Sequence, residues 1–331
     1  MNSFKNVYVT GSIAYDTIMD FPGEFKDYFH PEKLHQINIS FVVDKLKKQI
    51  GGTGTNIAYN ISLISKIKDP SFVKTSEGKQ ISKILLLGSV GKDAREFLNF
   101  FKKNKIDVSG VIVYKKLYTS AGSVITDTKN NQIWGFYYGA SEKIPHTDFN
   151  KLNKKTDLLV ISANHQNSFL YFQREAIKYK IPYFYDPGMT LTWIKDKDLE
   201  EGVMNCQYLI GNDYEIGMIL KRLSVSINQL INTRTNVAVT LGEKGVDYYD
   251  VGAKRDLPIH INVYQVKKMV DPTGAGDAWR GGFVAGLLMN YSIRDCLKLG
   301  NVMASFAIEK YGTVNHRPTK NDIEKRMVKL S

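Results

Sequence analysis

Apolar runs separated by helix-like segments recur along the chain. The first covers residues 7–10 and ends at Gly11, and a stronger run at residues 84–87 is apolar at every position. Runs without polar alternation are typical of strands in a parallel sheet that is covered on both faces. Further runs of this kind follow in the second half of the chain, at residues 158–161, 183–185, 208–210 and 237–240. Because helix-like segments separate most of them, the pattern predicts an α/β fold with a mainly parallel central sheet.

Three segments indicate helices that can cover such a sheet. Residues 56–64 follow a cluster of glycines, and a second segment places Phe97 and Phe101 one turn apart on one face. Residues 278–289 follow another glycine-bearing loop and contain several small residues. Small side chains suit close packing of this last helix against its neighbours.

Two other stretches alternate polar and apolar residues, which is typical of a sheet with one solvated face. Residues 35–42 form the first, and residues 111–138 form the second. Within the second stretch, strands at 118–125 and 132–138 flank a turn at 128–131. Both stretches interrupt the α/β pattern, so we expect them to form a small separate β-sheet.

The domain prediction combines the two patterns. Residues 1–331 are expected to form a single domain, in which insertions at approximately 17–48 and 111–138 build a small β-sheet lid. The composition, 43% hydrophobic and 24% charged over 331 residues, is that of a globular chain able to bury a sizeable core.

The chain is basic, with 45 Lys and Arg against 33 Asp and Glu and a formal net charge of +12. Such a surplus can indicate a nucleic-acid partner. The charge is dispersed, however, and the densest run, residues 45–48, is too short for a basic arm. We therefore expect a solvated lysine-rich surface and no nucleic-acid partner.

The two cysteines, Cys206 and Cys296, are far apart and lie near no His pair, so neither a disulfide framework nor a zinc site is predicted. We expect both to be small core residues in a reducing compartment. No apolar stretch approaches the roughly 18 residues of a membrane span, and the N-terminus lacks a signal-peptide pattern. These features predict a cytoplasmic protein without a membrane partner.

Residues 271–279, Asp-Pro-Thr-Gly-Ala-Gly-Asp-Ala-Trp, are the most informative segment. Small residues at a helix start let backbone N–H groups converge on one point, where the helix dipole favours an anion. Asp277 falls in the first turn, beside that point. A carboxylate there fits a base that takes the proton from a hydroxyl group attacking a phosphorus atom. The alternative is an ordinary turn followed by an acidic N-cap.

This segment resembles the C-terminal signature of the PfkB, or ribokinase, family of carbohydrate kinases. Residues 51–58, Gly-Gly-Thr-Gly-Thr-Asn-Ile-Ala, resemble the family's N-terminal signature. Between them, residues 212–215 resemble its Asn-x-x-Glu motif and residues 240–245 its Thr-x-Gly-x-x-Gly turn. The resemblance covers nearly the whole chain. It implies a ribokinase-like three-layer α/β/α fold with a β lid and an ATP-dependent kinase acting on an alcohol group.

The resemblance implies roles for the residues of these motifs. Asp277 matches the catalytic base, and the anion hole around the moving phosphoryl group is matched by Gly274, Ala275 and Gly276. Asn212 and Glu215 match the pair that organises Mg²⁺ near the ATP phosphates, largely through water. Their alternative is purely structural, a helix N-cap with its capping-box glutamate.

Further matches concern the nucleotide and a second cation. Thr240, Gly242 and Gly245 match residues that contact ATP, although the same segment also fits a simple hairpin turn. Asn301 matches a position beside the adenine, and its alternative is a solvated helix residue. Asp271 matches a position associated with monovalent-cation binding in parts of the family, so K⁺ is a possible second ion beside Mg²⁺.

The matching substrate residues are Asp16, Gly52 and Asn56, which hold a ribose in the family. Asp16 follows the first strand in what reads as a turn, and without the resemblance all three would be judged structural. Ser12 lies at a substrate position where some adenosine kinases carry Asn, so polar contacts there are expected to differ.

The lid segments, including Phe41, Trp134 and Phe136, resemble those of bacterial adenosine-kinase-like members, as does Arg280 after the aromatic Trp279. An aromatic lid suits a flat purine. The aromatic residues can equally form the lid's own small core.

Transfer of phosphate from ATP to the 5′-hydroxyl of adenosine is therefore the expected reaction. Ribose, a broader range of nucleosides, and a catalytically silent nucleoside-binding protein are the alternatives. No dinucleotide-binding or P-loop motif is present. Both a monomer and a homodimer are compatible with the sequence.

Overall fold

The computed structural model describes residues 4–29, 38–67, 81–129, 131–251 and 257–330, apart from the side chains of Gln132 and Trp134. Within these ranges a nine-stranded sheet runs through the body in the order β13-β12-β11-β10-β9-β8-β1-β4-β5. Neighbours from β11 to β5 are parallel, and β12 and β13 add an antiparallel edge. The strands are β1 (Asn6–Thr10), β4 (Lys83–Gly91), β5 (Asp107–Tyr114), β8 (Asp157–Ser162), β9 (Tyr183–Asp186), β10 (Tyr208–Asn212), β11 (Asn236–Thr240), β12 (Val246–Tyr249) and β13 (Ile259–Ile261).

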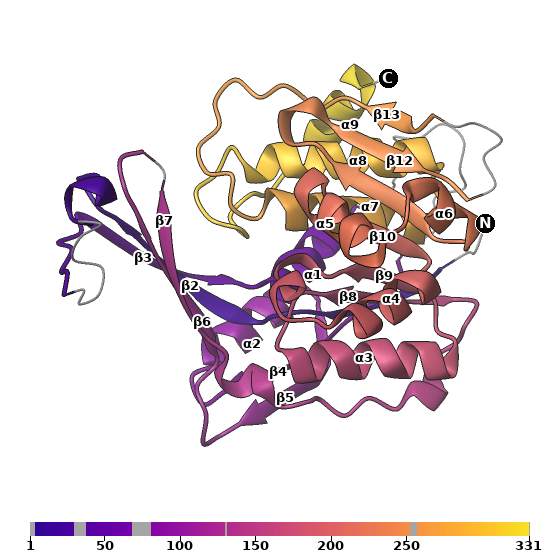
Figure 1. Cartoon of the computed structure of the whole chain (residues 1–331), viewed down its shortest axis with the longest axis horizontal. Coiled ribbons are helices and arrows are strands. Elements are labelled where there is room, and N and C mark those ends of the chain that lie inside the picture. Colours follow the sequence, from indigo (N-terminus) through magenta and orange to yellow (C-terminus); the bar gives the residue numbers. More distant parts are fainter. Residues whose placement is uncertain (1–3, 30–37, 68–80, 130, 252–256, 331) are drawn as a thin grey trace.

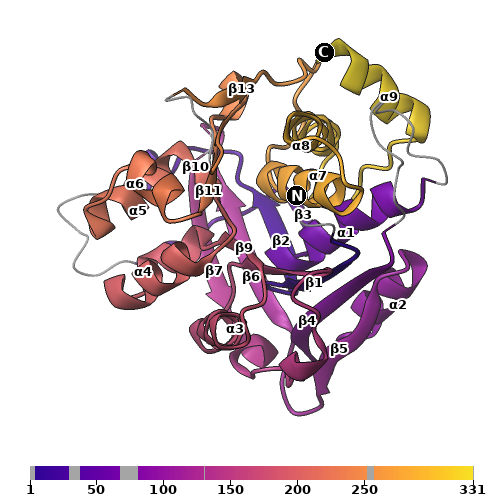
Figure 2. The ribbon, with the colours of Figure 1, turned by 90° about the vertical axis from the view of Figure 1, so that its right-hand side faces the viewer.

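Helices cover both faces of this sheet, as the end-on view in Figure 2 shows. One face carries α1 (Thr53–Ser65), α2 (Arg95–Lys103), α7 (Ala275–Leu288) and α8 (Ile293–Ala307), with α9 (Lys320–Lys329) packed outside α8. The other face carries α3 (Gln166–Tyr179), α4 (Asp196–Asn205), α5 (Asp213–Leu223) and α6 (Ile227–Asn232). The predicted three-layer α/β/α architecture is confirmed.

The strands that read as continuous apolar runs are those buried on both faces. All six residues of β8 are buried, and residues 84–91 of β4 are buried as well. Two clusters of core side chains result, one on each side of the sheet. Cys206 and Cys296 are free and buried, as predicted. Helix α7 packs so closely against α8 that there is no room for a Cβ at Gly282 or Gly286, so glycine at these positions allows the contact.

A second, four-stranded sheet projects from the body as a lid (Figure 1). Its order is β3-β2-β6-β7, from β2 (Ala14–Asp20), β3 (Lys45–Gly51), β6 (Ser120–Thr126) and β7 (Gln132–Tyr137). The strands β2 and β6 pair in parallel, and the outer pairs are antiparallel. The predicted turn at 128–131 joins β6 to β7, although Asn130 lies outside the described residues.

Two predictions about the lid are wrong in detail. The first insertion's strand is β3, at residues 45–51, and not 35–42; residues 38–42 form no strand, and residues 35–37 lie outside the described part of the chain. The run at residues 45–48 is solvent-exposed on both sides because the lid projects from the body, so its sequence shows no alternation. Residues 111–114 belong to β5 in the main sheet, so the second lid segment begins only at Ser120.

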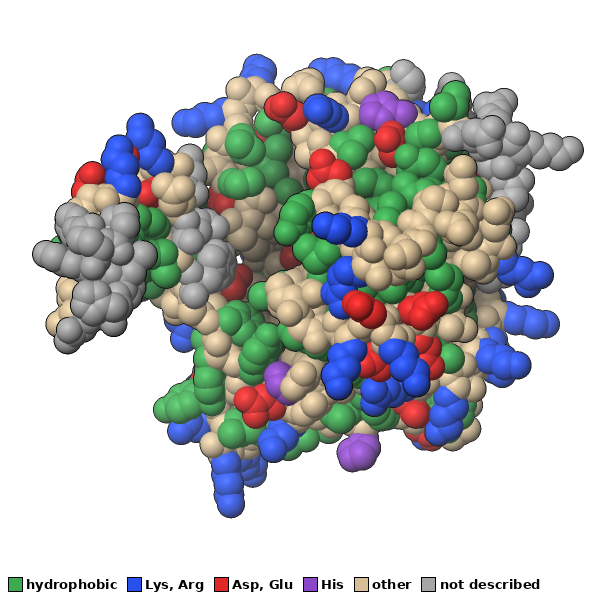
Figure 3. Space-filling model, in the orientation of Figure 1, with side chains coloured by type: hydrophobic (Ala, Val, Ile, Leu, Met, Phe, Trp, Pro, Cys, Tyr) green, Lys and Arg blue, Asp and Glu red, His purple; other side chains and the backbone are tan. Residues whose placement is uncertain are grey.

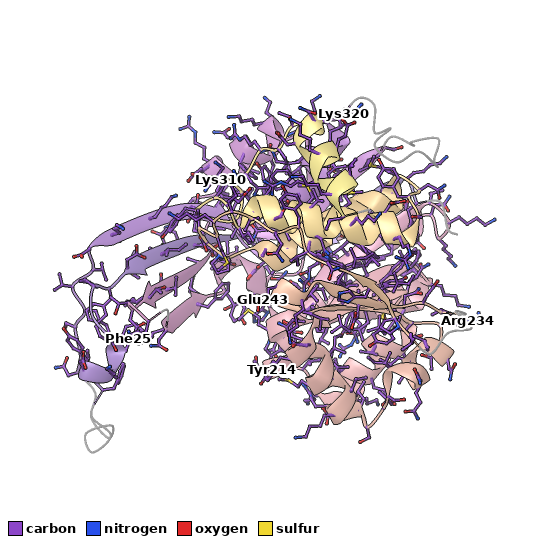
Figure 4. All side chains as sticks on the ribbon, turned by 90° about the horizontal axis from the view of Figure 1, so that it is seen from above. Phe25, Tyr214, Arg234, Glu243, Lys310 and Lys320 are labelled. Carbon is purple, nitrogen blue, oxygen red and sulfur yellow. The ribbon has the colours of Figure 1, made fainter. Side chains whose placement is uncertain are left out.

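Phe41 packs at the tip of the lid against aromatic side chains from the same insertion. Its ring centroid lies 4.8 Å from Phe21 and 5.1 Å from Phe25. Figure 4 places Phe25 at the outer end of the lid, far from the body. The alternative of a small core belonging to the lid itself therefore describes Phe41. Among the described helices, none is long and apolar enough to cross a membrane.

Candidate active site

The strand order reverses between β1 and β8, and this point organises the site. Strands β1, β4 and β5 follow one another in one direction, and β8 to β11 follow in the other. Open α/β sheets bind ligands at the carboxyl ends of their strands at such a switch point. There the backbone N–H of Ser12 donates to the carbonyl of Ala163 at 3.1 Å, and the Thr53 hydroxyl donates to the same carbonyl at 2.8 Å.

Gly52, the N-cap of α1, packs tightly against the backbone of Ser12. Its φ is +90°, and a Cβ there would lie 2.4 Å from the carbonyl oxygen of Ser12. The Ser12 hydroxyl in turn accepts a hydrogen bond from the Thr53 N–H at 3.0 Å. Ser12 and Gly52 therefore fix the start of α1, and their contact with a substrate stays a prediction.

The N-terminus of α7 lies across from α1 and presents free backbone donors. Gly274 adopts φ +79° as the N-cap. The N–H of Ala275 donates to the carbonyl of Pro272 at 3.2 Å, so it is already engaged. The N–H groups of Gly276 and Asp277 have no acceptor within the described part of the chain. Free amides at a helix N-terminus can bind an anion. Gly276 and Asp277 offer such donors here, and the part of Gly274 and Ala275 in the predicted anion hole stays a prediction.

Asp277 occupies the first turn of α7 with one carboxylate oxygen fixed and the other open. Its Oδ2 accepts a hydrogen bond of 2.8 Å from the Nδ2 of Asn56, whereas Oδ1 has no donor among the described residues. Burial raises the pKa of Asp277 to about 6, while Arg280 and Asn56 act in the opposite direction. At neutral pH the group is ionised and weakly basic, as a general base requires.

Asp16 faces the same point from the lid. It lies within β2, paired with Gln49 of β3 and Gly122 of β6, so the predicted turn position is wrong. Neither carboxylate oxygen has a hydrogen-bond donor among the described residues. Burial, and then the charge of Asp277, raise the pKa of Asp16 to about 7. Such a carboxylate is an unsatisfied acceptor for hydroxyl groups.

The neighbouring strand β3 ends in a glycine, which leaves room for the Asp16 side chain. A Cβ on Gly51 would lie 1.8 Å from Oδ2 of Asp16. The double glycine of the 51–58 motif therefore serves two contacts, one with the lid carboxylate and one with the backbone of Ser12.

A buried ion pair closes the site on the side of β9. The Nη2 of Arg280 contacts Oδ1 of Asp186 at 2.5 Å, and Oδ2 of Asp186 accepts a hydrogen bond from the Ser162 hydroxyl at 2.7 Å. Glu215 Oε2 lies 3.8 Å from the same Arg280 nitrogen. Asp186 was missed by sequence reasoning, although a carboxylate at the carboxyl end of a predicted strand is a recognisable signal. Arg280 was noticed only as a family feature.

Asn212 and Glu215 form a complete capping box at the start of α5. The Asn212 side chain accepts from the Glu215 N–H at 2.7 Å, and Glu215 Oε2 accepts from the Asn212 N–H at 2.8 Å. Oε1 of Glu215 has no partner among the described residues and faces Gly188 in the cavity wall. The structural alternative is thus correct for this pair, and one carboxylate oxygen remains available to a ligand.

A cavity of about 760 Å³ extends from Asp277 towards the β11–β12 edge of the body. It opens beside the hollow between lid and body in Figure 3, along which carboxylate side chains are visible. Figure 4 shows Glu243, which lines this cavity, and the exposed Tyr214 on the side of the body that faces the lid. The other walls of the cavity are largely apolar and include Met189, Val263, Tyr264, Val266, Met269, Ala304 and Ile308.

The predicted nucleotide residues lie around this cavity. Thr240, Gly242 and Gly245 line it, and they form the hairpin between β11 and β12. The hairpin reading is thus correct, and contact with ATP stays a prediction. Gly245 adopts φ +100°, and a Cβ there would lie 2.1 Å from the carbonyl oxygen of Ile261.

Asn301 also lines the cavity and is buried, not solvated. Its Oδ1 accepts from the Trp279 indole at 2.9 Å, and its Nδ2 donates to the carbonyls of Ile261 and Asn262 at 3.1 and 2.7 Å. The side chain thus supports the cavity wall.

Asp271 lies outside the cavity lining, on the loop before α7. Its Oδ1 accepts from the Thr273 N–H and its Oδ2 from the Gly312 N–H, both at 2.9 Å. This clamp joins the loop before α7 to the loop after α8. The described residues contain no cluster of three or more His, Cys, Asp or Glu side chains arranged to hold a metal ion.

Comparison with known proteins identifies the architecture. The sequence model described as pfkB family carbohydrate kinase matches residues 22–320. The chain belongs to this family. As a pfkB family member it is an ATP-dependent kinase that acts on a hydroxyl group, which confirms the resemblance seen in the sequence.

Two curated relatives of this pfkB kinase are similar over nearly their whole length. The nucleoside kinase of Methanocaldococcus jannaschii is 26% identical over 306 residues, which are 92% of this chain and 94% of that protein. The nucleoside kinase of Methanothermobacter thermautotrophicus is 28% identical over 331 residues, with 98% and 96% covered.

Solved structures show the same ribokinase-like fold. The Burkholderia thailandensis nucleoside kinase in complex with inosine superimposes with a TM-score of 0.82 at 25% identity, covering 98% of this chain and 97% of that one. A ribokinase from Cryptococcus neoformans in complex with ADP has a TM-score of 0.75 at 20% identity, over 98% and 100% of the two chains, and shows the fold alone.

Proposed function

We propose that this pfkB family enzyme is a nucleoside kinase, which transfers the γ-phosphoryl group of ATP to the 5′-hydroxyl of a purine nucleoside such as adenosine. The observation that carries the proposal is the open Oδ1 of Asp277, which lies beside the free amides of α7 and across from the unpaired carboxylate of Asp16. The similarity to nucleoside kinases, one of them in complex with inosine, supports the same substrate class.

The ribose would bind between the lid and the body. Asp16 has two free acceptor oxygens, which match two neighbouring sugar hydroxyls. Asn56 uses Nδ2 for Asp277, but its Oδ1 is buried without a partner in the described structure. An unsatisfied buried acceptor is costly, and a ligand hydroxyl would satisfy it. Ser12 and Gly52 would shape this end through the backbone.

The base would lie against the lid, where one row of paired residues leaves room for a flat ring. Asp16 pairs with Gly122, and Gly122 pairs with Phe136, so the three share one face of the sheet. Gly122 has no side chain to fill the space between them. The Phe136 ring is partly exposed, and its centroid lies 5.0 Å from that of Tyr138. The Tyr138 ring centroid lies 4.9 Å from that of His165. This aromatic series favours a planar base over a sugar without one.

The reaction follows from these positions. The 5′-oxygen forms a bond to the γ-phosphorus of ATP, the bond to the β,γ-bridging oxygen breaks, and ADP leaves. Asp277 Oδ1 takes the hydroxyl proton, and the N–H groups of Gly276 and Asp277 bind the developing negative charge. Exclusion of water by the lid would suppress hydrolysis of ATP.

Nucleotide and cations would occupy the 760 Å³ cavity. The hairpin of Thr240, Gly242 and Gly245 and the apolar walls would hold ATP. Mg²⁺ neutralises phosphate charge when bound with ATP, and the free Oε1 of Glu215 fits the water shell of such an ion, because Mg²⁺ requires few direct protein ligands. K⁺ near Asp271 stays a prediction, as do the cytoplasmic location, the lack of a nucleic-acid partner and the oligomeric state.

A panel of acceptors tests the proposal. ADP release is measured with adenosine, inosine, guanosine, cytidine and ribose, each with and without Mg²⁺. We expect purine nucleosides to give the highest kcat/KM and removal of Mg²⁺ to abolish turnover. A clear preference for ribose would select the sugar-kinase alternative, and nucleoside binding without any turnover would select the silent-binder alternative.

A further inference from the structure

Arg280 is an arginine that is only 7% exposed in the wall of the active-site cavity. It follows Asp277 by three positions, so both side chains lie on the same face of α7. Arginine is almost never buried to this degree without partners. The partners of Arg280 therefore indicate what the position is for.

One end of the guanidinium is fixed. Nη2 contacts Asp186 Oδ1 at 2.5 Å, and Asp186 is itself held by the Ser162 hydroxyl at 2.7 Å. Glu215 Oε2, at 3.8 Å from Nη2, adds a second carboxylate on the same side. Because Ser162 and Asp186 end two neighbouring sheet strands, the planar group is held on a rigid support.

The remaining guanidinium nitrogens lack partners. Neither Nε nor Nη1 has a hydrogen-bond acceptor among the described residues, and Nε is fully buried. Nη1 lies next to Gly276: a Cβ built on that glycine would be 2.7 Å from it. The unpaired N–H groups of Gly276 and Asp277 belong to the same turn of helix. Nη1 and these two backbone N–H groups, all without acceptors among the described residues, therefore lie close together, and such a group of donors favours a bound anion.

We propose that Arg280 is a catalytic residue that binds the phosphoryl group during transfer through Nη1, completing the anion site formed by the Gly276 and Asp277 amides. This rests on the proposed phosphoryl transfer at this site. Arg280 neither gives nor accepts a proton: the oxygen–phosphorus bond forms, the bridging bond breaks, and the proton goes to Asp277. Arg280 only compensates charge on the non-bridging oxygens. A planar fork can bind Asp186 and an oxyanion at once, which the point charge of a lysine cannot do equally well.

The test compares Arg280→Gln with Arg280→Lys. We expect Arg280→Gln to lower kcat by about 100- to 1000-fold, as for loss of one oxyanion donor, with KM for the nucleoside unchanged. Arg280→Lys should recover part of the lost kcat. The discriminating readout is binding of ADP with aluminium fluoride and nucleoside, a mimic of the transferring group. Arg280→Gln should bind ADP like the wild type but lose the aluminium fluoride complex.

Arg222→Gln is the matched control. Arg222 also forms an ion pair, with Asp196, and donates to the carbonyl of Leu191 at 2.8 Å, but it lies outside the cavity lining. It should lower the melting temperature without changing kcat. If Arg280→Gln fails to fold, the double variant Arg280→Gln/Asp186→Asn removes the unpaired buried carboxylate and is scored on the same aluminium fluoride complex.

Two results overturn the proposal. One is a kcat for Arg280→Gln within tenfold of the wild type, and the other is an aluminium fluoride complex of wild-type affinity despite a low kcat. Failure of the nucleoside assignment is a separate outcome, because it would show in the wild-type acceptor panel. The Arg280 variants are then measured with the acceptor that the wild type does use.

Discussion

Asn56 and Asp277, 221 positions apart in the sequence, are joined by a hydrogen bond of 2.8 Å from Nδ2 to Oδ2. This bond links the first turns of α1 and α7, which follow the two glycine motifs. It holds one oxygen of the carboxylate and leaves the other open. The two motifs are thus brought together in one place, and the bond fixes the direction in which the Asp277 carboxylate faces.

Replacement of the base should separate binding from chemistry. We expect Asp277→Asn to bind ATP and nucleoside with nearly unchanged affinity, because the amide keeps the shape of the side chain, and to lose about 100- to 10,000-fold in kcat because it cannot accept the proton. Calorimetry gives the affinities and ADP release gives kcat. A variant that turns over at the wild-type rate would contradict the assignment.

The pH dependence of kcat/KM should reflect the two raised carboxyl pKa values. Asp277, with a pKa of about 6, must be ionised to act, and Asp16, with a pKa of about 7, binds hydroxyls best when ionised. Activity should therefore fall as the pH drops through 7 and 6. In Asn56→Ala the hydrogen bond that lowers the pKa of Asp277 is gone, so this acidic limb should move to higher pH. A limb at the same pH in both proteins would exclude Asp277 as its source.

The same shifts predict a change in stability. A carboxyl whose pKa is higher in the folded state opposes folding once it ionises, so its stabilising contribution is lost as the pH rises through the folded-state pKa. Without ligands, Asp277→Asn and Asp16→Asn should exceed the wild type at pH 8 by on the order of 2 kcal/mol in the free energy of unfolding. At pH 5 the difference should shrink. Urea titrations at the two pH values measure it.

Gly52 should not accept a side chain. In Gly52→Ala the Cβ would meet the Ser12 carbonyl oxygen at 2.4 Å on a backbone with φ +90°, so we expect a loss of several-fold or more in nucleoside affinity and of about 1–3 kcal/mol in stability. Gly217→Ala is the control, because Gly217 lies in α5 with nothing within 4 Å of the added Cβ. It should stabilise the protein by about 0.5–1 kcal/mol.

The cross-strand neighbours Asp16, Gly122 and Phe136 predict which aromatic residue contacts the nucleobase. Phe136→Ala should raise KM for purine nucleosides and leave KM for ATP unchanged, because Phe136 shares the face of Asp16. Tyr137→Ala is the matched control: Tyr137 is adjacent but lies on the opposite face and is 49% exposed. Equal effects of the two substitutions on KM would show that the ring of Phe136 does not contact the base.

Much of the body could be predicted because its central strands are largely apolar. Strands β4 and β8 have no solvated face, so their composition identifies them. The short glycine motifs could be recognised for a different reason. Each motif places its functional groups within one turn of helix, so the local sequence is sufficient to identify it.

The parts that sequence reasoning missed depend on long-range contacts. Strand β3 carries Lys45, Lys47 and Lys48 because its outer half is exposed on both faces, so no local pattern marks it. Arg280 and Asp186 are 94 positions apart, and only the packing of α7 against β9 brings them together. Asp16 was placed in a turn because β2 starts only three residues after Gly11.

Asp16 lies on the lid, whereas Asp277 lies on the body. The two carboxylates that are proposed to flank the sugar therefore belong to separate parts of the molecule, and any rotation of the lid about its base would change their separation. If Asp16 anchors the sugar, the lid angle decides whether the 5′-hydroxyl reaches Asp277. A nucleoside that holds the lid at another angle would occupy the pocket without reacting, so discrimination among substrates can arise in turnover even where affinities are alike.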